Sequence, residues 1–413
     1  MARAGWLLAV VASVALLATS AGPAPAPSLV ARTDPPPLGA TEQRHWVGAW
    51  ATAPVRERHD ERRVVRDQSF RIVARLTLGG PRLRARLSNV YGSDPVTFTQ
   101  VRVALRVSGP AVDPATDHQA RFGGKPRVTV PAGREIVSDE VSFPTRPGTD
   151  VAVSFHVVDG VATRHPLAFT THYASPPGSG DATADIRGER FTAQTHTTYF
   201  LTGVDVWAPH ARGAVVTLGD SITDGSSSTP DTYGRWPDVL ARRLAKHNVG
   251  VLNAGISANA VTPVGSRPGG GDPAMARLTR DVLRQSGVRA LVVLEGTNDL
   301  ATKATAADVI DGLRFIAQRA RQAGLTVVGA TILPRGCGEF WTADAEQHRK
   351  AVNRWIRTTP AFDAVVDLET VMRDPAAPTC LHPRYDSGDG LHPNQEGMRR
   401  IADAMPLSVL VGR

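Results

Sequence analysis

The chain has 413 residues, which is long enough for two domains and a sizeable hydrophobic core. Hydrophobic residues make up 42% and charged residues 21% of the sequence, as in an ordinary globular protein. The formal net charge is +8, but the basic residues are spread along the chain, whereas nucleic-acid-binding proteins usually concentrate them. We therefore expect no nucleic-acid partner.

Residues 1–21 have the pattern of a secretory signal peptide. Arg3 supplies a positive charge, residues 6–17 form a short apolar stretch, and residues 19–21 are small enough for cleavage. The apolar stretch is shorter than a membrane span, which makes an uncleaved anchor the less favoured interpretation. The Pro- and Ala-rich composition that follows predicts a disordered leader over residues 22–44. The sequence thus predicts a secreted protein with no membrane span in its mature chain.

Residues 45–208 have the pattern of an all-β domain. Short stretches alternate hydrophobic and polar residues, and Gly, Pro and Asp separate them, which is typical of an antiparallel β-sandwich. The expected strands are 71–78, 82–88, 96–107, 126–130, 135–143, 150–158, 167–173 and 198–207. Ten arginines lie between Arg56 and Arg86, and we expect them on a solvated strand face; a surface that faces an anionic polymer or lipid headgroups is the less favoured alternative. We interpret this region as an accessory domain.

From residue 213 to 413 the pattern changes to apolar strands that alternate with helices. The expected strands are 214–218, 250–254, 290–295, 326–333 and 364–368, and the expected helices are 234–247, 272–286, 306–323, 343–358 and 393–405. Continuously apolar strands, each followed by a helix, indicate a parallel sheet covered on both faces. We therefore predict a three-layer α/β/α sandwich, in which ligands bind beyond the carboxyl ends of the strands.

Polar motifs follow four of these strands. They are Gly219-Asp220-Ser221, Asn253-Ala254-Gly255, Gly296-Thr297-Asn298-Asp299 and Asp389-Gly390-Leu391-His392. Because the carboxyl ends of parallel strands share one edge of the sheet, all four motifs are expected at the same edge.

The residue types in these motifs suit acyl transfer. The Ser221 hydroxyl needs an adjacent base to act as a nucleophile, and His392 can supply it if Asp389 holds the correct tautomer. The Ser221 amide, the Gly255 amide and the Asn298 side chain are candidate donors to an oxyanion.

Each motif also has a purely structural interpretation. Ser221 could cap a helix, Gly255 could be an ordinary turn glycine, and Asn298 could occupy a left-handed loop position. His382 is a rival base, but it lacks an Asp three residues before it.

With all four motifs in order, residues 213–404 resemble the SGNH (GDSL) hydrolase family. The small departure is Ile222, where the family's name has Leu. The resemblance implies a flavodoxin-like α/β/α sandwich, with Ser221 as nucleophile, His392 as base and Asp389 as the residue that orients it. It implies an oxyanion hole of Ser221, Gly255 and Asn298, and no metal or organic cofactor. It does not extend to residues 45–208, although the layout looks like that of secreted two-domain bacterial members.

The chain has two cysteines, Cys337 and Cys380. In an exported protein an isolated pair is most simply a disulfide, and two cysteines alone do not make a structural zinc site. Cys337 follows the fourth strand and Cys380 precedes Asp389 and His392. We expect the bridge to fix the loop that carries these two residues to the sheet.

The resulting hypothesis is a secreted serine esterase that cleaves carboxylic esters through an acyl-enzyme. Its substrates remain open. The first possibility is small esters or lipid esters, and the protein would then be a general esterase or a lipase. The second is acetylated extracellular polysaccharide. A glycan-binding protein that has lost catalysis is a third alternative. Residues 256–271 are Gly- and Pro-rich and only weakly apolar, unlike a lipase lid, which favours short acyl groups. The sequence indicates no oligomeric state.

Overall fold

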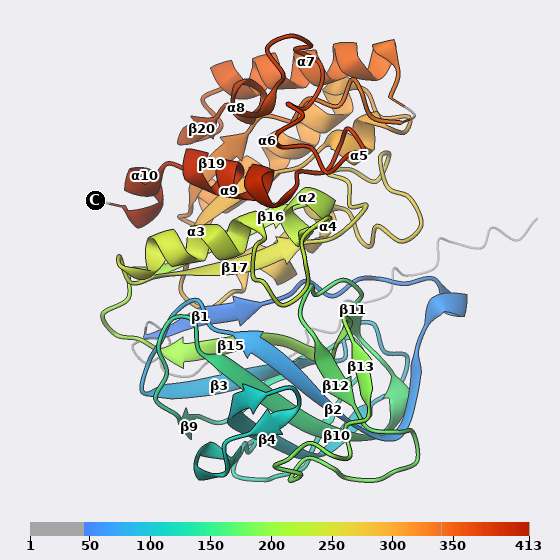
Figure 1. Cartoon of the computed structure of the whole chain (residues 1–413), viewed down its shortest axis with the longest axis vertical. Coiled ribbons are helices and arrows are strands. Elements are labelled where there is room, and N and C mark those ends of the chain that lie inside the picture. Colours follow the sequence, from blue (N-terminus) through green and yellow to red (C-terminus); the bar gives the residue numbers. More distant parts are fainter. Residues whose placement is uncertain (1–44, 340, 413) are drawn as a thin grey trace, which may run out of the picture. The chain divides into compact units, whose positions relative to one another are not determined.

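The computed structural model describes residues 45–339 and 341–412 (Figure 1). The signal peptide and the leader expected over residues 1–44 lie outside the described residues. No helix within the described ranges is both long and apolar enough to cross a membrane.

The first part of the described chain consists mainly of antiparallel strands in two sheets. One sheet has the order β1 (Trp46–Ala51), β15 (Leu201–Trp207), β3 (Arg82–Ser88) and β8 (Glu135–Val137), and β9 (Val141–Ser142) also pairs with β3. The other has the order β13 (Ala193–Thr195), β12 (His172–Ala174), β2 (Val64–Arg75), β10 (Asp150–Val161), β4 (Val96–Ser108) and β5 (Ala111–Val112), with β6 (His118–Gln119) and β7 (Val128–Val130) paired to β4. Two short strands, β11 (Arg164–His165) and β14 (Thr198–Tyr199), pair separately, and η1 (His59–Glu61) and η2 (Pro114–Thr116) are single 3₁₀ turns.

Buried aromatic side chains fill the space between these strands. Phe155 lies 5.6 Å from Phe98 and 5.8 Å from Phe70, measured between ring centroids. Phe200 packs edge-on against the same rings. Its positive φ of 54° interrupts the expected strand 198–207, which is why β14 and β15 are separate.

Further expectations for this part were also wrong. The strand expected at 71–78 runs from Val64 to Arg75, because polar Gln68 and Ser69 are buried and bonded to Ser175 rather than exposed. Most of 167–173 is loop, since β12 begins only at His172. Arg71 is not solvated: it is 1% exposed and donates to Ser154 Oγ at 2.7 Å.

The second part contains the predicted parallel sheet. Its order is β17 (Val249–Gly255), β16 (Gly213–Gly219), β18 (Val288–Leu294), β19 (Thr326–Ala330) and β20 (Ala364–Val366), and every neighbouring pair is parallel. The first strand lies between the second and the third, which creates a topological switch point. In register, Gly219 lies opposite both Gly255 and Leu294. The polar motifs that follow β16, β17 and β18 therefore lie side by side at the carboxyl edge of the sheet.

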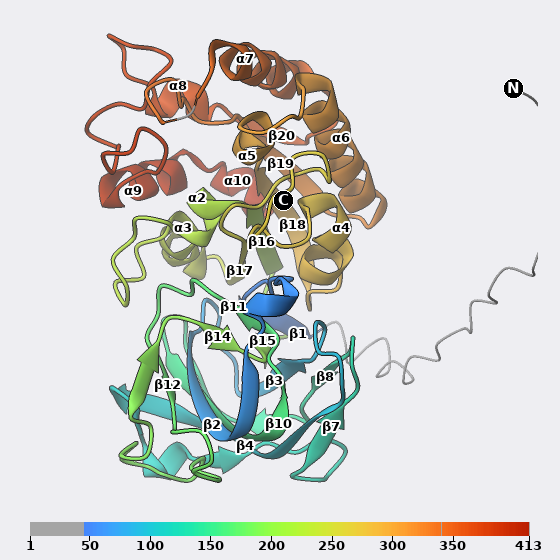
Figure 2. The ribbon, with the colours of Figure 1, turned by 90° about the vertical axis from the view of Figure 1, so that its right-hand side faces the viewer.

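Helices cover both faces of this sheet (Figure 2). One face packs against α4 (Ala274–Leu278), α6 (Ala306–Gln322) and α7 (Ala343–Thr358), and the other against α3 (Trp236–Ala245), α8 (Leu368–Met372), α9 (Gln395–Ala404) and α10 (Leu407–Val411). The short helices α2 (Ser221–Asp224) and α5 (Thr297–Leu300) begin at the sheet edge. The helix expected at 272–286 is divided, because α4 continues as the π-helical turn η3 (Thr279–Leu283).

Candidate active site

Ser221 stands at the turn from strand β16 into helix α2. Asp220 caps the helix by accepting a hydrogen bond from the Ile222 amide at 2.9 Å. At Gly219 an added Cβ would lie 2.4 Å from the Leu294 carbonyl oxygen, so a side chain does not fit there. Ser221 is 7% exposed, and its own amide has no hydrogen-bond partner among the described residues. The turn thus holds a hydroxyl and an unpaired amide at the same residue.

His392 and Asp389 lie beside this serine. His392 Nε2 is 2.9 Å from Ser221 Oγ, and His392 Nδ1 is 2.6 Å from Asp389 Oδ2. The other Asp389 oxygen accepts the amides of Leu391 at 2.9 Å and His392 at 2.7 Å. Partial burial opposes ionisation of Asp389, but the hydrogen bonds from His392 outweigh it and lower the pKa of the carboxyl group. The rival base, His382, instead accepts the Arg384 amide through Nδ1 at 3.0 Å.

Asn298 is fixed in orientation at the start of α5. Its Oδ1 accepts a hydrogen bond from Arg267 Nη2 at 2.8 Å, and its Nδ2 donates to the Asn259 carbonyl at 2.8 Å. The side chain is 2% exposed. One of the two Nδ2 hydrogens therefore remains for another acceptor.

Gly255 has a different environment from the one the sequence suggested. Its amide donates to Asn253 Oδ1 at 2.8 Å and is already engaged. A Cβ at this position would lie 2.2 Å from the Asp224 nitrogen and 2.6 Å from the Thr223 carbonyl carbon. Glycine is needed here because helix α2 approaches so closely. Farther along the same loop, Ala258 has a positive φ of 62°, and its amide has no partner among the described residues.

Three buried carboxyl groups lie near the serine turn. Burial raises the pKa of Asp220 to about 6. Burial also raises the pKa of Glu295 well above its ordinary value, and neither of its carboxyl oxygens has a hydrogen-bond partner among the residues that the structure describes. Asp299 instead accepts the amides of Val261 and Thr262, at 2.8 and 3.0 Å, which gives it a structural role in the loop after β17. No sequence pattern singles out Glu295.

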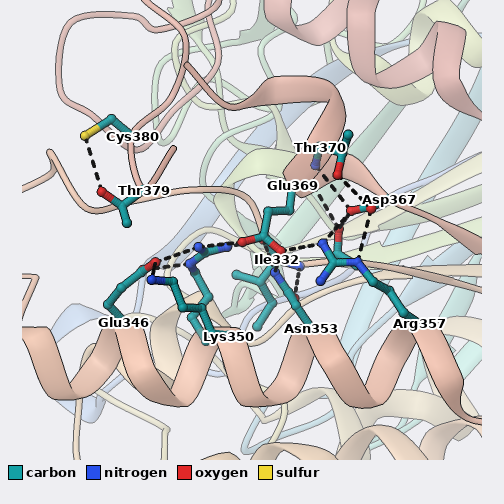
Figure 3. Close-up of polar contacts among 12 residues, drawn as sticks. Ile332, Glu346, Lys350, Asn353, Arg357, Asp367, Glu369, Thr370, Thr379 and Cys380 are labelled. Atoms are coloured by element: carbon teal, nitrogen blue, oxygen red, sulfur yellow. Dashed lines mark hydrogen bonds and ion pairs between the residues drawn. The ribbon is translucent and has the colours of Figure 1, made fainter. Parts of the chain in front are cut away.

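The chain after β19 is anchored by a polar network on α7 (Figure 3). Asn353 bonds both the amide and the carbonyl of Ile332, each at 2.8 Å. Arg349, which is fully buried, adds a bond to the same carbonyl and pairs with Glu346 and Glu369, at 2.7 and 2.8 Å. This network explains why the strand expected at 326–333 ends at Ala330: the backbone of Ile332 bonds to side chains instead of to a neighbouring strand.

The predicted disulfide is confirmed. Cys337 and Cys380 are bonded across 43 positions of sequence. Nearby, the Gly336 amide donates to the Thr379 carbonyl at 2.6 Å. An added Cβ at Gly390 would lie 2.7 Å from the backbone of Cys337, so the loop that carries Asp389 and His392 packs directly on the bridged segment.

A histidine of the antiparallel part contacts helix α2, the serine helix that begins at Ser221. His165, at the end of β11, is 3% exposed, and its Nε2 is 3.0 Å from Asp224 Oδ1 at the end of α2. The other Asp224 oxygen accepts the amide and hydroxyl of Ser257, at 2.8 and 2.7 Å. Burial opposes protonation of His165, but the Asp224 carboxylate outweighs it and raises the pKa of His165. Because the two residues are 59 positions apart, no local pattern predicts the pair.

Among residues 45–339 and 341–412 we find no group of three or more His, Cys, Asp or Glu side chains that could hold a metal ion.

Residues 217–400 match the model of the GDSL-like lipase/acylhydrolase family. Among solved structures the chain is similar to a GDSL-like lipase from Bacteroides thetaiotaomicron, at 20% identity over 48% of this chain and 87% of that chain, with a TM-score of 0.38. It is also similar to a lipase/acylhydrolase from Enterococcus faecalis, at 22% identity over 48% of this chain and 93% of that chain, with a TM-score of 0.37. A carbohydrate acetylesterase from Sinorhizobium meliloti has 18% identity over 46% of this chain and 95% of that chain, with a TM-score of 0.36. No curated protein matches the chain.

The family match on a parallel, helix-covered sheet defines the class of this protein: it is an ester hydrolase. More narrowly, residues 217–400 form a GDSL-like lipase/acylhydrolase domain, as the four motifs predicted.

Proposed function

We propose that the protein is a secreted serine esterase that hydrolyses carboxylic esters through an acyl-enzyme. The observation that carries the proposal is the hydrogen-bonded series from Ser221 Oγ through His392 to Asp389, with distances of 2.9 and 2.6 Å. A serine hydroxyl, an imidazole and a carboxylate in this order are the groups that nucleophilic acyl transfer requires.

The reaction proceeds in two halves. Ser221 Oγ attacks the ester carbonyl carbon while His392 Nε2 takes the hydroxyl proton. The tetrahedral intermediate then collapses, the bond to the alcohol oxygen breaks, and His392 returns the proton to the departing alcohol. In the second half, water attacks the acyl-serine as His392 takes its proton. Collapse of this second intermediate releases the carboxylic acid, and the proton returns to Ser221.

The negative oxygen of each tetrahedral intermediate needs hydrogen-bond donors. The Ser221 amide and the remaining Nδ2 hydrogen of Asn298 are assigned this role, because neither has another acceptor within residues 45–339 and 341–412. The Gly255 amide can join them only by leaving Asn253 Oδ1. Loss of one such donor lowers kcat by about 100- to 1,000-fold.

Secretion and short acyl groups complete the proposal. The N-terminal pattern of residues 1–21 supports export, and the disulfide is consistent with an oxidising compartment. The weakly apolar residues 256–271 favour a short acyl chain over a long one.

Hydrolysis of p-nitrophenyl esters from acetate to palmitate tests the proposal. Wild type should be most active on acetate, and Ser221→Ala and His392→Ala should abolish that activity. His382→Ala is the matched control, because this histidine lies in the same loop and its side chain accepts a hydrogen bond from the backbone amide of Arg384 in that loop. A maximum at long chains would make the protein a lipase, whereas equal rates for wild type and Ser221→Ala would reject the proposed nucleophile.

A further inference from the structure

Arg335 is a buried arginine without an acidic partner. It lies in the loop between β19 and α7 and is 7% exposed. Its Nη1 makes two long contacts of 3.3 Å, to the carbonyl and the hydroxyl of Thr297. Its Nε is buried with no hydrogen-bond partner, and its Nη2 forms no hydrogen bond or ion pair with a described residue.

Three other buried arginines of the described chain, Arg71, Arg277 and Arg349, donate hydrogen bonds from every guanidinium nitrogen. Arg277 pairs with Asp281 and bonds four further times, and Arg349 pairs with two glutamates. Arg71 has no carboxylate partner, but its Nε, Nη1 and Nη2 all donate to oxygen acceptors. A buried charge is costly unless it is paired, so an arginine with a free edge requires a separate explanation.

The surroundings of Arg335 are the residues of the candidate active site. Thr297, which it contacts, immediately precedes Asn298. Asp220, before the nucleophile, and Asp389, beside His392, both act electrostatically on the guanidinium group. Burial is the main reason that the pKa of Arg335 is lowered, and the positive charge of nearby Arg267 contributes to it. Arg267 is itself bonded to Asn298, so the two guanidinium groups contact the consecutive residues Thr297 and Asn298.

The unpaired edge has the geometry that recognises an oxyanion. Nε and Nη2 present parallel hydrogens along one edge, and arginine binds a carboxylate through two such hydrogens at once. The ring centroid of Trp341 lies 5.0 Å from Cζ in a cation–π contact, which uses none of the hydrogens of Nε and Nη2. Since Nε is enclosed, the loop that carries Arg335 has to yield locally when a ligand binds.

We propose that Arg335, assisted by Arg267, binds an anionic oxygen group of the ester substrate, so that the enzyme selects esters that carry a carboxylate or a similar anion. This inference rests on the proposed esterase function. It assigns Arg335 to substrate selection and not to the acyl-transfer steps.

The test compares pairs of esters that differ only in charge. For the alcohol side, 3-acetoxybenzoate is compared with 3-acetoxybenzamide, and for the acyl side, monoethyl adipate with ethyl adipamate, at pH 7.5 in a pH-stat. In at least one pair, wild type should hydrolyse the anion with a kcat/KM about tenfold higher or more. Arg335→Met should remove this preference, and Arg335→Lys, which keeps the charge but loses the planar fork, should retain only part of it. Arg319→Met, at an exposed position of α6, is the control for general charge effects and should keep the wild-type preference.

Two results would overturn the proposal. One is hydrolysis of all four esters by wild type with no preference for either anion. The other is an unchanged preference in Arg335→Met with a displaced pH–rate profile, which would mean that Arg335 serves Asp220 and Asp389 instead of the substrate. Failure of the esterase function is distinguishable, because wild type would then hydrolyse none of the four esters faster than Ser221→Ala.

Discussion

The close approach of Gly255 to helix α2 predicts a large effect from one added methyl group. In Gly255→Ala the Cβ would lie 2.2 Å from the Asp224 nitrogen, whereas ordinary contact begins at 3.4 Å. The atoms in conflict are backbone atoms, so the helix has to move outward by roughly 1 Å, and a displacement of that size at a reacting group costs about 100-fold in rate. The serine at the start of α2 moves with it. Overpacking of this kind also lowers the free energy of unfolding by about 1–3 kcal/mol.

The assay is kcat for p-nitrophenyl acetate, normalised to folded protein, together with urea denaturation. Gly109→Ala is the control: φ there is +51°, so the variant is strained, but no atom lies within 4 Å of the added Cβ. It should lose stability and keep its kcat. If Gly255→Ala keeps the wild-type kcat, the argument that Gly255 positions the serine helix is wrong.

Three further predictions concern the disulfide, two buried histidines and Asp389. Replacing both Cys337 and Cys380 by Ser should lower the free energy of unfolding by roughly 4 kcal/mol and reduce activity below the unfolding temperature; full activity in the reduced enzyme would show that the bridge does not hold the loop. His165→Gln and His172→Gln should respond oppositely to pH in denaturation experiments. Because folding raises the pKa of His165, protonated His165 stabilises the folded protein fully below pH 6.5. This contribution to the free energy of unfolding is lost as the pH rises through the pKa of His165 in the folded state. Burial lowers the pKa of His172 to about 3, so its stabilisation is present above pH 6.5 and lost between 6.5 and 3; parallel profiles would contradict this. Asp389→Asn should reduce kcat by up to about 10,000-fold by favouring the wrong tautomer of His392, and a loss below tenfold would exclude that role.

The α/β part of the fold could be predicted closely from the sequence. Helix α7 occupies the expected residues 343–358, because its amphipathic period begins at the capping residue Thr342. Strands β16, β17 and β18 lie within two residues of the expected positions, since each is a continuous apolar run.

The antiparallel part was less predictable. Strand β1 was missed because its residues 46–51 are nearly all buried and show no alternation. The neighbours of each strand depend on contacts distant in sequence. The ten arginines looked like a solvated face, but Arg84 and Arg86 both pair with buried Asp205.

The candidate site also contains some residues whose positions could be predicted from the sequence and others whose positions could not. Ser221, His392 and Asp389 come together because their motifs follow strands that end at one edge of a parallel sheet. The engaged amide of Gly255 had a local signal, because Asn253 two residues earlier can accept it in an Asx turn. The pair between His165 and Asp224 had none, since it forms only when the two parts of the chain meet.

The role of Ser221 as the nucleophile can be measured directly by covalent labelling. A fluorophosphonate reacts with an activated serine, and mass spectrometry of the digested protein locates the adduct. We expect one adduct, on the peptide that contains Ser221, which disappears in Ser221→Ala and forms far more slowly in His392→Ala. An adduct on Ser257, whose hydroxyl donates to Asp224 Oδ2 at 2.7 Å, or no adduct at all, would contradict the proposed mechanism.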